Sequence, residues 1–472
     1  MMGAVSQQVM DMNINDTLEY MRFPIPEDIL RRKLYGDYAG AIRLIDRRLQ
    51  DSTVPEPLRC SLQVQRKICQ ELPGEFPYTR DEAMAIIHQD VPDFTEEEFE
   101  ELVDARKIRW IFVNGEERYF HLFYDSLCKA VPEFSRRVQQ QTGSPESLAA
   151  TKDAAAFRDL TIEKMKKNGS MTVRIRARAS VRLKDELFTP GMFLRVHLPV
   201  PADCDQQTDI RIEKIQPEGG MVAPADAGQR TVCWEGTFSK NQEFLVEYSY
   251  LHTARYKDAY QGTGIAGDHS FDVQEQQPHI VFTPYIRSLC QELTEGLTDP
   301  LAKARAIYDF ITKNMYYTFM PHYVLQESFA ENCALSRTGD CGIFALLFIT
   351  LCRCAGIPAQ WQSGLSVTPD SIGCHDWARF YAEPYGWMFA DTSFGVSAMR
   401  AGAEERRQFY FGNLDPYRMV ANRTFQENFT IPKHQWRADP YDNQSGEMES
   451  ADRGFLYHEF EETKTILLCE EI

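Results

Sequence analysis

The sequence predicts a multidomain α+β protein. Helical spacing dominates residues 25–165, an alternation of apolar and polar residues begins at Met171, and a strongly apolar helix starts near residue 341. At 472 residues the chain is long enough for two to four domains, each with its own core. We expect four parts: a mainly helical N-terminal region over 1–165, a β-sandwich over 170–283, a mixed α+β core over 284–425 and a C-terminal extension over 426–472.

Helices separated by Gly, Pro and Asp breaks are expected in the N-terminal region. Their predicted ranges are 26–34, 38–49, 57–72, 80–88 and 95–106. A β-hairpin follows at 110–120, with Asn114-Gly115 as its turn. Helices followed by a hairpin could form a winged-helix-like unit, but the glutamates at 96–101 would repel DNA. We therefore expect a partner-binding or purely structural role for this region.

A linker is predicted next, with a turn at 142–145 and a basic, polar end at 164–169. From Met171 the apolar residues recur every second position, and arginines occupy the alternate positions up to Arg182. The same alternation returns at 192–198, near 210–212 and 232, and at 244–250. Strands at this spacing, with Gly and Pro turns between them, are typical of a β-sandwich. The arginine row could bind an anion, although exposed charge rows are usually solvated.

A further helix is predicted to start at Asp299-Pro300, with the carboxylate as cap and proline at the first helical position. Its apolar stripe runs to Met315 and predicts a buried face. Tyr316 and Tyr317 follow directly. One of them could donate a hydrogen bond to an oxyanion, and simple aromatic packing is the alternative.

The stretch 337–395 carries the residues best suited to chemistry. Cys341 begins an apolar run that ends at Cys354, and Gly339 and Asp340 predict the turn and N-cap before it. A thiol attacks as the thiolate, and the unpaired N–H groups and dipole of a helix's first turn stabilise that anion. We therefore predict that Cys341 is a nucleophile at the tip of a buried helix.

His375 and Asp391 flank a predicted hairpin. Residues 377–382 alternate as in a strand, and the Pro-Tyr-Gly turn at 384–386 reverses the chain. The start of the first strand should thus lie beside the end of the second, although the sequence leaves the register open. If the two side chains meet, the carboxylate orients the imidazole so that its other nitrogen faces the thiol.

Three motifs follow one another in this stretch: Gly339-Asp340-Cys341, His375-x-Trp377 and Asp391-Thr392. In this order they resemble the transglutaminase-like superfamily, and residues 411–418 resemble a segment that follows the core in bacterial members. The resemblance covers about residues 285–425. It implies a papain-like α+β core whose Cys341, His375 and Asp391 fill the triad positions.

The resemblance implies a cysteine-dependent enzyme that acts on an amide, either a peptide bond or a glutamine side chain, through a thioester acyl-enzyme. The acyl group then passes to water, as in a protease or amidase, or to an amine, as in a transferase. We expect hydrolysis, because an amine needs its own site. The alternative is an inactive domain that serves as a protein-binding scaffold. Cys374, beside His375, is expected to be a core thiol.

Composition and charge limit the kinds of partner and the compartment that we expect for this protein. The net charge of −18 argues against nucleic-acid binding, which needs clustered Lys and Arg. No secretory signal is recognised at the N-terminus, and no apolar run is long enough to span a bilayer. The scattered cysteines, without C-x-x-C pairs, predict reduced thiols and a cytoplasmic protein. We expect a protein or peptide substrate, a possible protein partner at the helical N-terminal region, no membrane, no metal and no cofactor.

The C-terminal extension becomes polar after residue 425. Residues 439–452 are predicted to form a mobile loop. The apolar residues 465–468 are expected to add a strand to one of the sheets.

Overall fold

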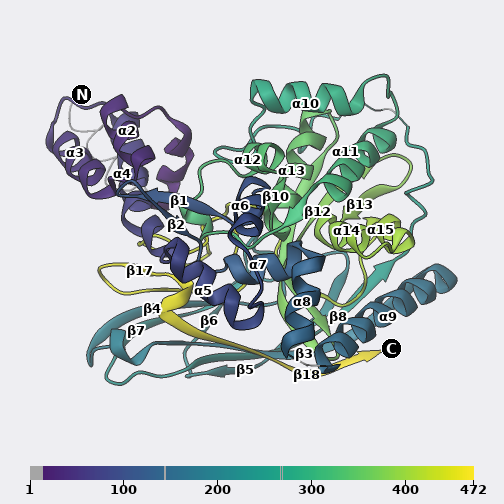
Figure 1. The fold of residues 1–472 in the computed structure, drawn as a ribbon. Coiled ribbons are helices and arrows are strands. Elements are labelled where there is room, and N and C mark those ends of the chain that lie inside the picture. Colours follow the sequence, from purple (N-terminus) through teal and green to yellow (C-terminus); the bar gives the residue numbers. More distant parts are fainter. Residues whose placement is uncertain (1–13, 143–144, 266, 268) are drawn as a thin grey trace. The chain divides into compact units, whose positions relative to one another are not determined.

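The computed structural model describes residues 14–142, 145–265, 267 and 269–472. The chain divides into two compact units, each assembled from segments that are far apart in the sequence (Figure 1). The first unit comprises Met1–Ala155, Gln276–Val281 and Asn314–Ile343. The second comprises Ala156–Glu275, Phe282–Lys313 and Phe344–Ile472.

Helices make up most of the first unit, and the predicted helices are confirmed. The predicted helices are α2 (Glu27–Tyr35), α3 (Tyr38–Gln50), α4 (Glu56–Glu71), α5 (Arg80–Asp90) and α6 (Glu96–Asp104). The further helices of this unit are η1 (Ile14–Arg22), η2 (Leu72–Glu75), α7 (Phe123–Ala130), α8 (Pro132–Thr142), η4 (Tyr323–Leu325) and α12 (Phe329–Ser336). Thr79 and Thr95 begin α5 and α6 with capping boxes, each completed by a glutamate three residues later.

The predicted hairpin of the first unit is also confirmed. Strands β1 (Trp110–Val113) and β2 (Glu116–Tyr119) pair antiparallel. Asn114 and Gly115 adopt positive φ values of 53° and 81°, as a two-residue turn between twisted strands requires. A second, parallel pair joins β9 (Tyr316–Tyr317) to β10 (Thr338–Gly339).

The predicted linker is wrong at its basic end. Residues 164–168 belong to α9 (Pro145–Asn168), while Gly143 and Ser144 lie outside the described residues. Alanine, lysine and glutamate are strong helix formers and favour this long helix despite its polar composition. Ile162 and Met165 are buried in the main core of the second unit, which holds the end of the helix in place.

Antiparallel strands build two sheets of the second unit, and the strands predicted between 171 and 250 are confirmed. The strands are β3 (Ser170–Leu183), β4 (Met192–Pro199), β5 (Gln207–Gln216), β6 (Met221–Val222), β7 (Thr231–Phe238), β8 (Phe244–Arg255), β16 (Glu447–Glu449), β17 (Gly454–Phe455) and β18 (Phe460–Glu471), with η3 (Asp185–Leu187) and η5 (Tyr457–Glu459) as short helices. Among the described residues, the strand orders are β18-β3-β8-β5 and β17-β16-β4-β7-β6. One hydrophobic cluster contains residues of both sheets.

Strand β3 shows the predicted alternation. Its apolar side chains from Val173 to Leu183 are buried. On the other face, Arg176 and Arg178 form ion pairs with Glu247 at 3.2 and 2.6 Å. The arginine row is therefore matched by carboxylates of this sheet.

The C-terminal segment differs from one prediction and agrees with another. Residues 465–468 lie in β18, which pairs along β3, so this prediction is confirmed. The mobile loop predicted at 439–452 is wrong, because most of these residues are buried and β16 pairs with β4. Buried polar groups explain the error: Lys433 Nζ and Glu447 Oε2 lie 2.7 Å apart, and both side chains are completely buried.

A third sheet of the second unit has the strand order β14-β13-β12-β11-β15 among the described residues. Its strands are β11 (Ala359–Thr368), β12 (Ser371–Ala382), β13 (Gly386–Ala390), β14 (Phe411–Gly412) and β15 (Arg418–Asn422). The accompanying helices are α10 (Pro284–Thr294), α11 (Pro300–Asn314), α13 (Cys341–Cys354), α14 (Thr392–Arg400) and α15 (Glu404–Phe409).

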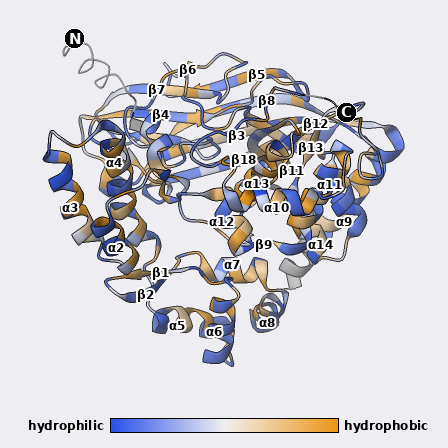
Figure 2. Cartoon of the chain, turned by 90° about the horizontal axis from the view of Figure 1, so that it is seen from above, coloured by the Kyte–Doolittle hydropathy of each residue, from blue (hydrophilic) through white to orange (hydrophobic). Residues whose placement is uncertain are grey.

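Two helices beside this sheet follow their predictions. The Asp299 carboxylate accepts the Leu301 N–H at 2.8 Å and so caps α11. Most of α13 consists of hydrophobic residues (Figure 2). Its Phe348 packs edge-on against Phe380 of β12, with 5.6 Å between the ring centroids. Across the part of the chain that the structure describes, no helix is both long enough and apolar enough to cross a membrane.

Candidate active site

Cys341 is the first residue of α13, as the sequence predicts. The Asp340 Oδ1 atom accepts the Ile343 N–H at 3.1 Å, which is the N-cap contact expected before this helix. The same oxygen accepts the Tyr323 hydroxyl at 2.5 Å. Burial raises the pKa of Asp340 to about 6, although these hydrogen bonds oppose the rise. The half-buried thiol therefore follows a carboxyl group that titrates near neutral pH.

A lysine of the N-terminal helices belongs to the surroundings of Cys341. The Lys129 ammonium of α7 lies over the rings of Tyr317 and Phe319, 4.8 and 4.6 Å from their centroids. Burial lowers the pKa of Lys129, and negative charge on Cys341 as thiolate, on Asp125 and on Asp340 opposes this shift. Because that interaction is mutual, a positive Lys129 favours the thiolate form of Cys341.

The tyrosines considered as oxyanion donors lie in β9, where Tyr317 pairs with Gly339. Each ring makes a cation–π contact. Lys107 Nζ lies 4.8 Å from the centroid of Tyr316, and Lys129 Nζ lies 4.8 Å from that of Tyr317. Oxyanion donation and aromatic packing against the core helix both stay predictions.

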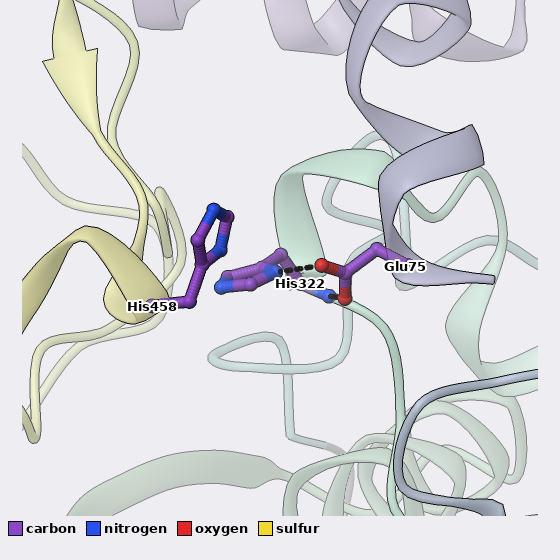
Figure 3. Close-up of side chains that lie close together, drawn as sticks. All are labelled: Glu75, His322 and His458. Carbon is purple, nitrogen blue, oxygen red and sulfur yellow. Dashed lines mark hydrogen bonds and ion pairs between the residues drawn. The ribbon is translucent and has the colours of Figure 1, made fainter. Parts of the chain in front are cut away.

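The segment between β9 and α12 is anchored by a buried glutamate of the N-terminal region. Glu75 Oε1 lies 2.9 Å from His322 Nδ1, and Glu75 Oε2 accepts the His322 backbone N–H at 3.2 Å (Figure 3). Burial alone would raise the pKa of Glu75, but His322 and His121 hold it below its usual value. The next residue, Tyr323, donates to Asp340. This chain of contacts leads from the N-terminal helices to the cap of α13.

His375 and Asp391 meet in the second unit. His375 Nε2 lies 2.8 Å from Asp391 Oδ2, and the Asp391 side chain is completely buried. The predicted hairpin forms, with Ala378 opposite Ala390 and Ala382 opposite Gly386. The predicted proximity of the two side chains is therefore confirmed.

Two details of the hairpin differ from the sequence predictions. His375 is the fifth residue of β12 rather than a residue at its start, because β12 continues back to Ser371 as the partner of β11. Cys374 is exposed rather than a core thiol, and its Sγ lies 3.4 Å from Lys464 Nζ. Strand alternation does turn Cys374 away from His375, but that face of β12 is open to solvent at this point.

Asp391 has structural contacts in addition to His375. Its Oδ1 accepts the Phe394 N–H at 2.8 Å, so Asp391 is also the N-cap of α14. The Phe394 ring lies 4.4 Å from the His375 ring. Helix α14 and the imidazole are thus positioned by the same carboxylate.

A buried arginine holds Asp391 from the other side. Arg418 Nη1 lies 2.9 Å from Asp391 Oδ2, and Arg418 Nη2 donates to Asp415 Oδ2 at 2.6 Å. The guanidinium is completely buried and lies 4.5 Å from the centroid of Phe394. Arg418 therefore joins two buried carboxylates to the imidazole site.

Electrostatics keeps both carboxylates ionised. Burial alone would raise the pKa of Asp391, but His375 and Arg418 hold it below its usual value. Burial alone would also raise the pKa of Asp415, but Arg418 lowers it to about 2. The pKa of Arg418 is raised in return, despite its burial.

Sequence reasoning did not assign roles to Arg418, Lys129 or Glu75. Arg418 lies in the segment 411–418 that resembles bacterial family members. That resemblance does not indicate the contact between Arg418 and Asp391. Lys129 and Glu75 are separated from Cys341 by more than two hundred residues and carry no local motif. Only tertiary contacts within the first unit could reveal them.

Comparison with known families matches residues 287–392 to the transglutaminase-like superfamily. The chain contains a transglutaminase-like core. The matched segment begins in α10, includes Cys341 and His375, and ends one residue after Asp391. Cys341 belongs to the first unit and His375 to the second, so their pairing stays a prediction.

Several solved structures are similar to this chain. A protein from Cytophaga hutchinsonii, provisionally described as a cysteine protease, is 16% identical with a TM-score of 0.43, covering 64% of this chain and 91% of its own. The periplasmic domain of TgpA from Pseudomonas aeruginosa is 15% identical with a TM-score of 0.26, covering 52% and 96%. A protein from Parabacteroides distasonis, provisionally described as a protease, is 11% identical with a TM-score of 0.21, covering 47% and 42%. No curated protein sequence matches significantly.

Replacing Asp340 of the transglutaminase-like core with asparagine should change how stability depends on pH. The pKa of Asp340 is about 6 in the folded protein and about 3.9 in an unfolded chain. Between these values the folded state binds more protons, so the stability linked to protonation is complete below about pH 4 and lost as pH rises through about 6. Asp340→Asn keeps an oxygen for the cap but cannot titrate. The variant should gain about 1–3 kcal/mol relative to wild type between pH 4 and 7.

Urea unfolding at intervals between pH 4 and pH 7 measures this difference. Asp104→Asn, at an exposed position at the end of α6, is the matched control and should follow wild type at every pH. Parallel curves for wild type and Asp340→Asn would contradict a raised pKa at this position.

Proposed function

We propose that this protein is a cysteine-dependent hydrolase or acyltransferase that acts on an amide, with Cys341, His375 and Asp391 as its triad. The observation that carries the proposal is the 2.8 Å contact between His375 Nε2 and the buried Asp391 carboxylate. An ionised, buried carboxylate holding an imidazole is the arrangement that orients a general base.

The proposed reaction begins when Cys341 loses its proton to His375. Because Asp391 engages Nε2, the accepting atom is Nδ1 of the same ring. The thiolate attacks the amide carbonyl, and the backbone N–H of Cys341 at the start of α13 is the natural first donor to the oxyanion. Collapse breaks the C–N bond, His375 returns the proton to the leaving amine, and a thioester remains on Cys341.

The surroundings of Cys341 support a reactive thiol. A helix N-terminus and a nearby ammonium both stabilise a thiolate, and here these are α13 and Lys129. Ionised Asp340 acts in the opposite direction at neutral pH. We infer that the reactivity of the thiol reflects this balance.

Hydrolysis is the favoured outcome of the thioester. Water reaches an open thioester without a dedicated site, whereas transfer to an amine requires a pocket that holds the acceptor. The proposed substrate is a protein or peptide, attacked at a peptide bond or at a glutamine carboxamide. The proposed role for the N-terminal helices is to contribute residues such as Lys129 and to bind a protein partner.

Alkylation of the intact protein by iodoacetamide between pH 5 and pH 9, with the modified cysteine identified by mass spectrometry, tests the proposal. Cys341 should react selectively and at pH values well below 8.5, where an ordinary thiol is protonated. His375→Ala should abolish this low-pH reactivity by removing the proton acceptor. His434→Ala, an exposed histidine, is the control and should leave it unchanged.

Uniform, slow labelling of the exposed cysteines, unaffected by His375→Ala, would contradict the enzyme proposal. It would support the alternative that the transglutaminase-like core is an inactive protein-binding scaffold. If labelling is selective, peptide hydrolysis and amine incorporation can be compared with one glutamine-containing peptide in the presence and absence of a primary amine.

A further inference from the structure

A cavity of about 440 Å³ lies within the second unit, between the end of β8 and the β12–β13 hairpin. Its apolar wall includes Trp387, Phe389 and Leu414. Pockets of this size hold small organic molecules, and most combine an apolar lining with a few polar groups. The cavity lies on the face of β12 that carries Arg379, whereas the adjacent Phe380 packs against α13 from the opposite face. It is therefore separate from the sheet face that α13 covers.

His252 and Arg379 are among the residues that line this cavity. His252 is only 1% exposed, and neither of its ring nitrogens has a hydrogen-bond partner among the described residues. Burial lowers the pKa of His252 to about 3, so the ring is neutral and offers one donor and one acceptor. The buried Nε of Arg379 also lacks a hydrogen-bond partner in the described structure. These nitrogens are themselves shielded from the cavity, whose walls offer a ligand cations and an apolar surface.

Three cations surround the same space: Arg255, Lys257 and Arg379. Burial lowers the pKa of Lys257, and the positive charges of Arg255 and Arg379 lower it further. The one carboxylate lining the cavity belongs to Asp205, whose side chain is 90% exposed and 3.9 Å from Arg379. An exposed ion pair at that distance neutralises little of the charge. This positive cluster is present although the chain as a whole carries a net charge of −18.

The side chains of the cluster leave donors for a ligand. Lys257 Nζ donates to the carbonyl oxygens of Tyr385 and Trp387 at 2.6 and 2.8 Å, which fixes the ammonium and leaves its third proton. The Arg379 guanidinium carbon lies over the aromatic wall, 4.8 Å from the centroid of Trp387 and 5.9 Å from that of Phe389. Lys257 and Arg379 are thus held in place before a ligand enters.

We propose that this cavity binds a small aromatic anion, whose phosphate or carboxylate contacts Arg255, Lys257 and Arg379 and whose ring lies against the apolar wall. Charge-assisted hydrogen bonds from fixed cations provide the affinity for the anionic group. The site is independent of the Cys341 chemistry, so it does not rest on the proposed enzyme function.

Isothermal titration of the full-length protein with four probes tests the proposal: 1-naphthyl phosphate, 1-naphthoate, 1-naphthol and inorganic phosphate. At least one of the two aromatic anions should bind, and its affinity should exceed that of both inorganic phosphate and 1-naphthol by tenfold or more. Preference for the phosphate or for the carboxylate identifies the anionic group. Failure of both aromatic anions to bind would overturn the proposal.

Variants locate the binding. Arg255→Met changes an exposed side chain and should not disturb folding, yet it should weaken binding of the aromatic anion by about tenfold or more. Arg379→Met should have at least the same effect, with folding checked by circular dichroism. Arg182→Met, on the solvent face of β3 and outside the cavity, is the matched control and should bind as wild type does. Equal binding by wild type, Arg255→Met and Arg379→Met would place the anion elsewhere and overturn the proposal.

Discussion

Arg418→Met is expected to lose about 3–5 kcal/mol of unfolding free energy at pH 7. The guanidinium is completely buried between the carboxylates of Asp391 and Asp415, so its removal leaves two buried negative charges without their cation. Breaking a buried ion pair by deleting one partner typically costs this much, because the remaining charge stays desolvated. Urea unfolding of wild type and variant at pH 7 measures the loss.

The loss should depend on pH in a defined direction. Both carboxylates have lowered pKa values in the folded protein, that of Asp415 being about 2. Their contribution to stability is therefore complete above the unfolded value of about 3.9 and is lost as pH falls through the lowered pKa values of the folded protein. The difference between wild type and Arg418→Met should shrink below pH 4. Arg423 is a less buried arginine that directly follows β15, and Arg423→Met is the control. This variant should change the free energy of unfolding by less than about 0.5 kcal/mol.

Lys433→Met is expected to cost about 3 kcal/mol of unfolding free energy, although Lys433 lies where the sequence becomes polar, after residue 425. Lys433 Nζ contacts Glu447 Oε2 at 2.7 Å and also donates to the Met448 carbonyl at 3.1 Å. Methionine matches the length of the side chain but leaves Glu447 buried without its closest cation. Arg437 Nε, 4.0 Å from Glu447, compensates only in part.

Thermal or urea unfolding measures this second loss. Lys240→Met removes an exposed lysine after β7 and should leave stability within about 0.5 kcal/mol of wild type. If Lys433→Met were equally neutral, the segment before β16 would behave as a mobile loop, and its buried ion pair would not contribute to the fold.

Local chemistry made much of the fold predictable. The Asn114-Gly115 turn, the Asp299 cap of α11 and the Asp340 cap of α13 are each specified by two to four neighbouring residues. The alternation of β3 is equally local, because every second side chain must be apolar to cover one buried face. Such signals need no knowledge of what lies elsewhere in the chain.

The candidate site was predictable in part for the same reason. A hairpin brings nearby residues together, so the meeting of His375 and Asp391 could be anticipated from the turn at 384–386. The extension of β12 back to Ser371 could not be predicted in this way, because it depends on the pairing of β12 with β11. The exposure of Cys374 follows from what covers each face of that sheet, which is again a property of the assembled fold.

The sequence by itself thus determined the secondary structure with strong local signals and the position of Cys341 on its helix. It also indicated, without fixing the strand register, that His375 and Asp391 lie close together. Only the tertiary structure showed that Arg418 holds Asp391, that Glu75 contacts His322 and that Lys433 and Glu447 make a polar segment part of the core. The physical reason is that a charged residue has the same local pattern whether it is solvated or buried. Its role is decided by the partner that replaces water, and that partner often comes from a distant part of the chain.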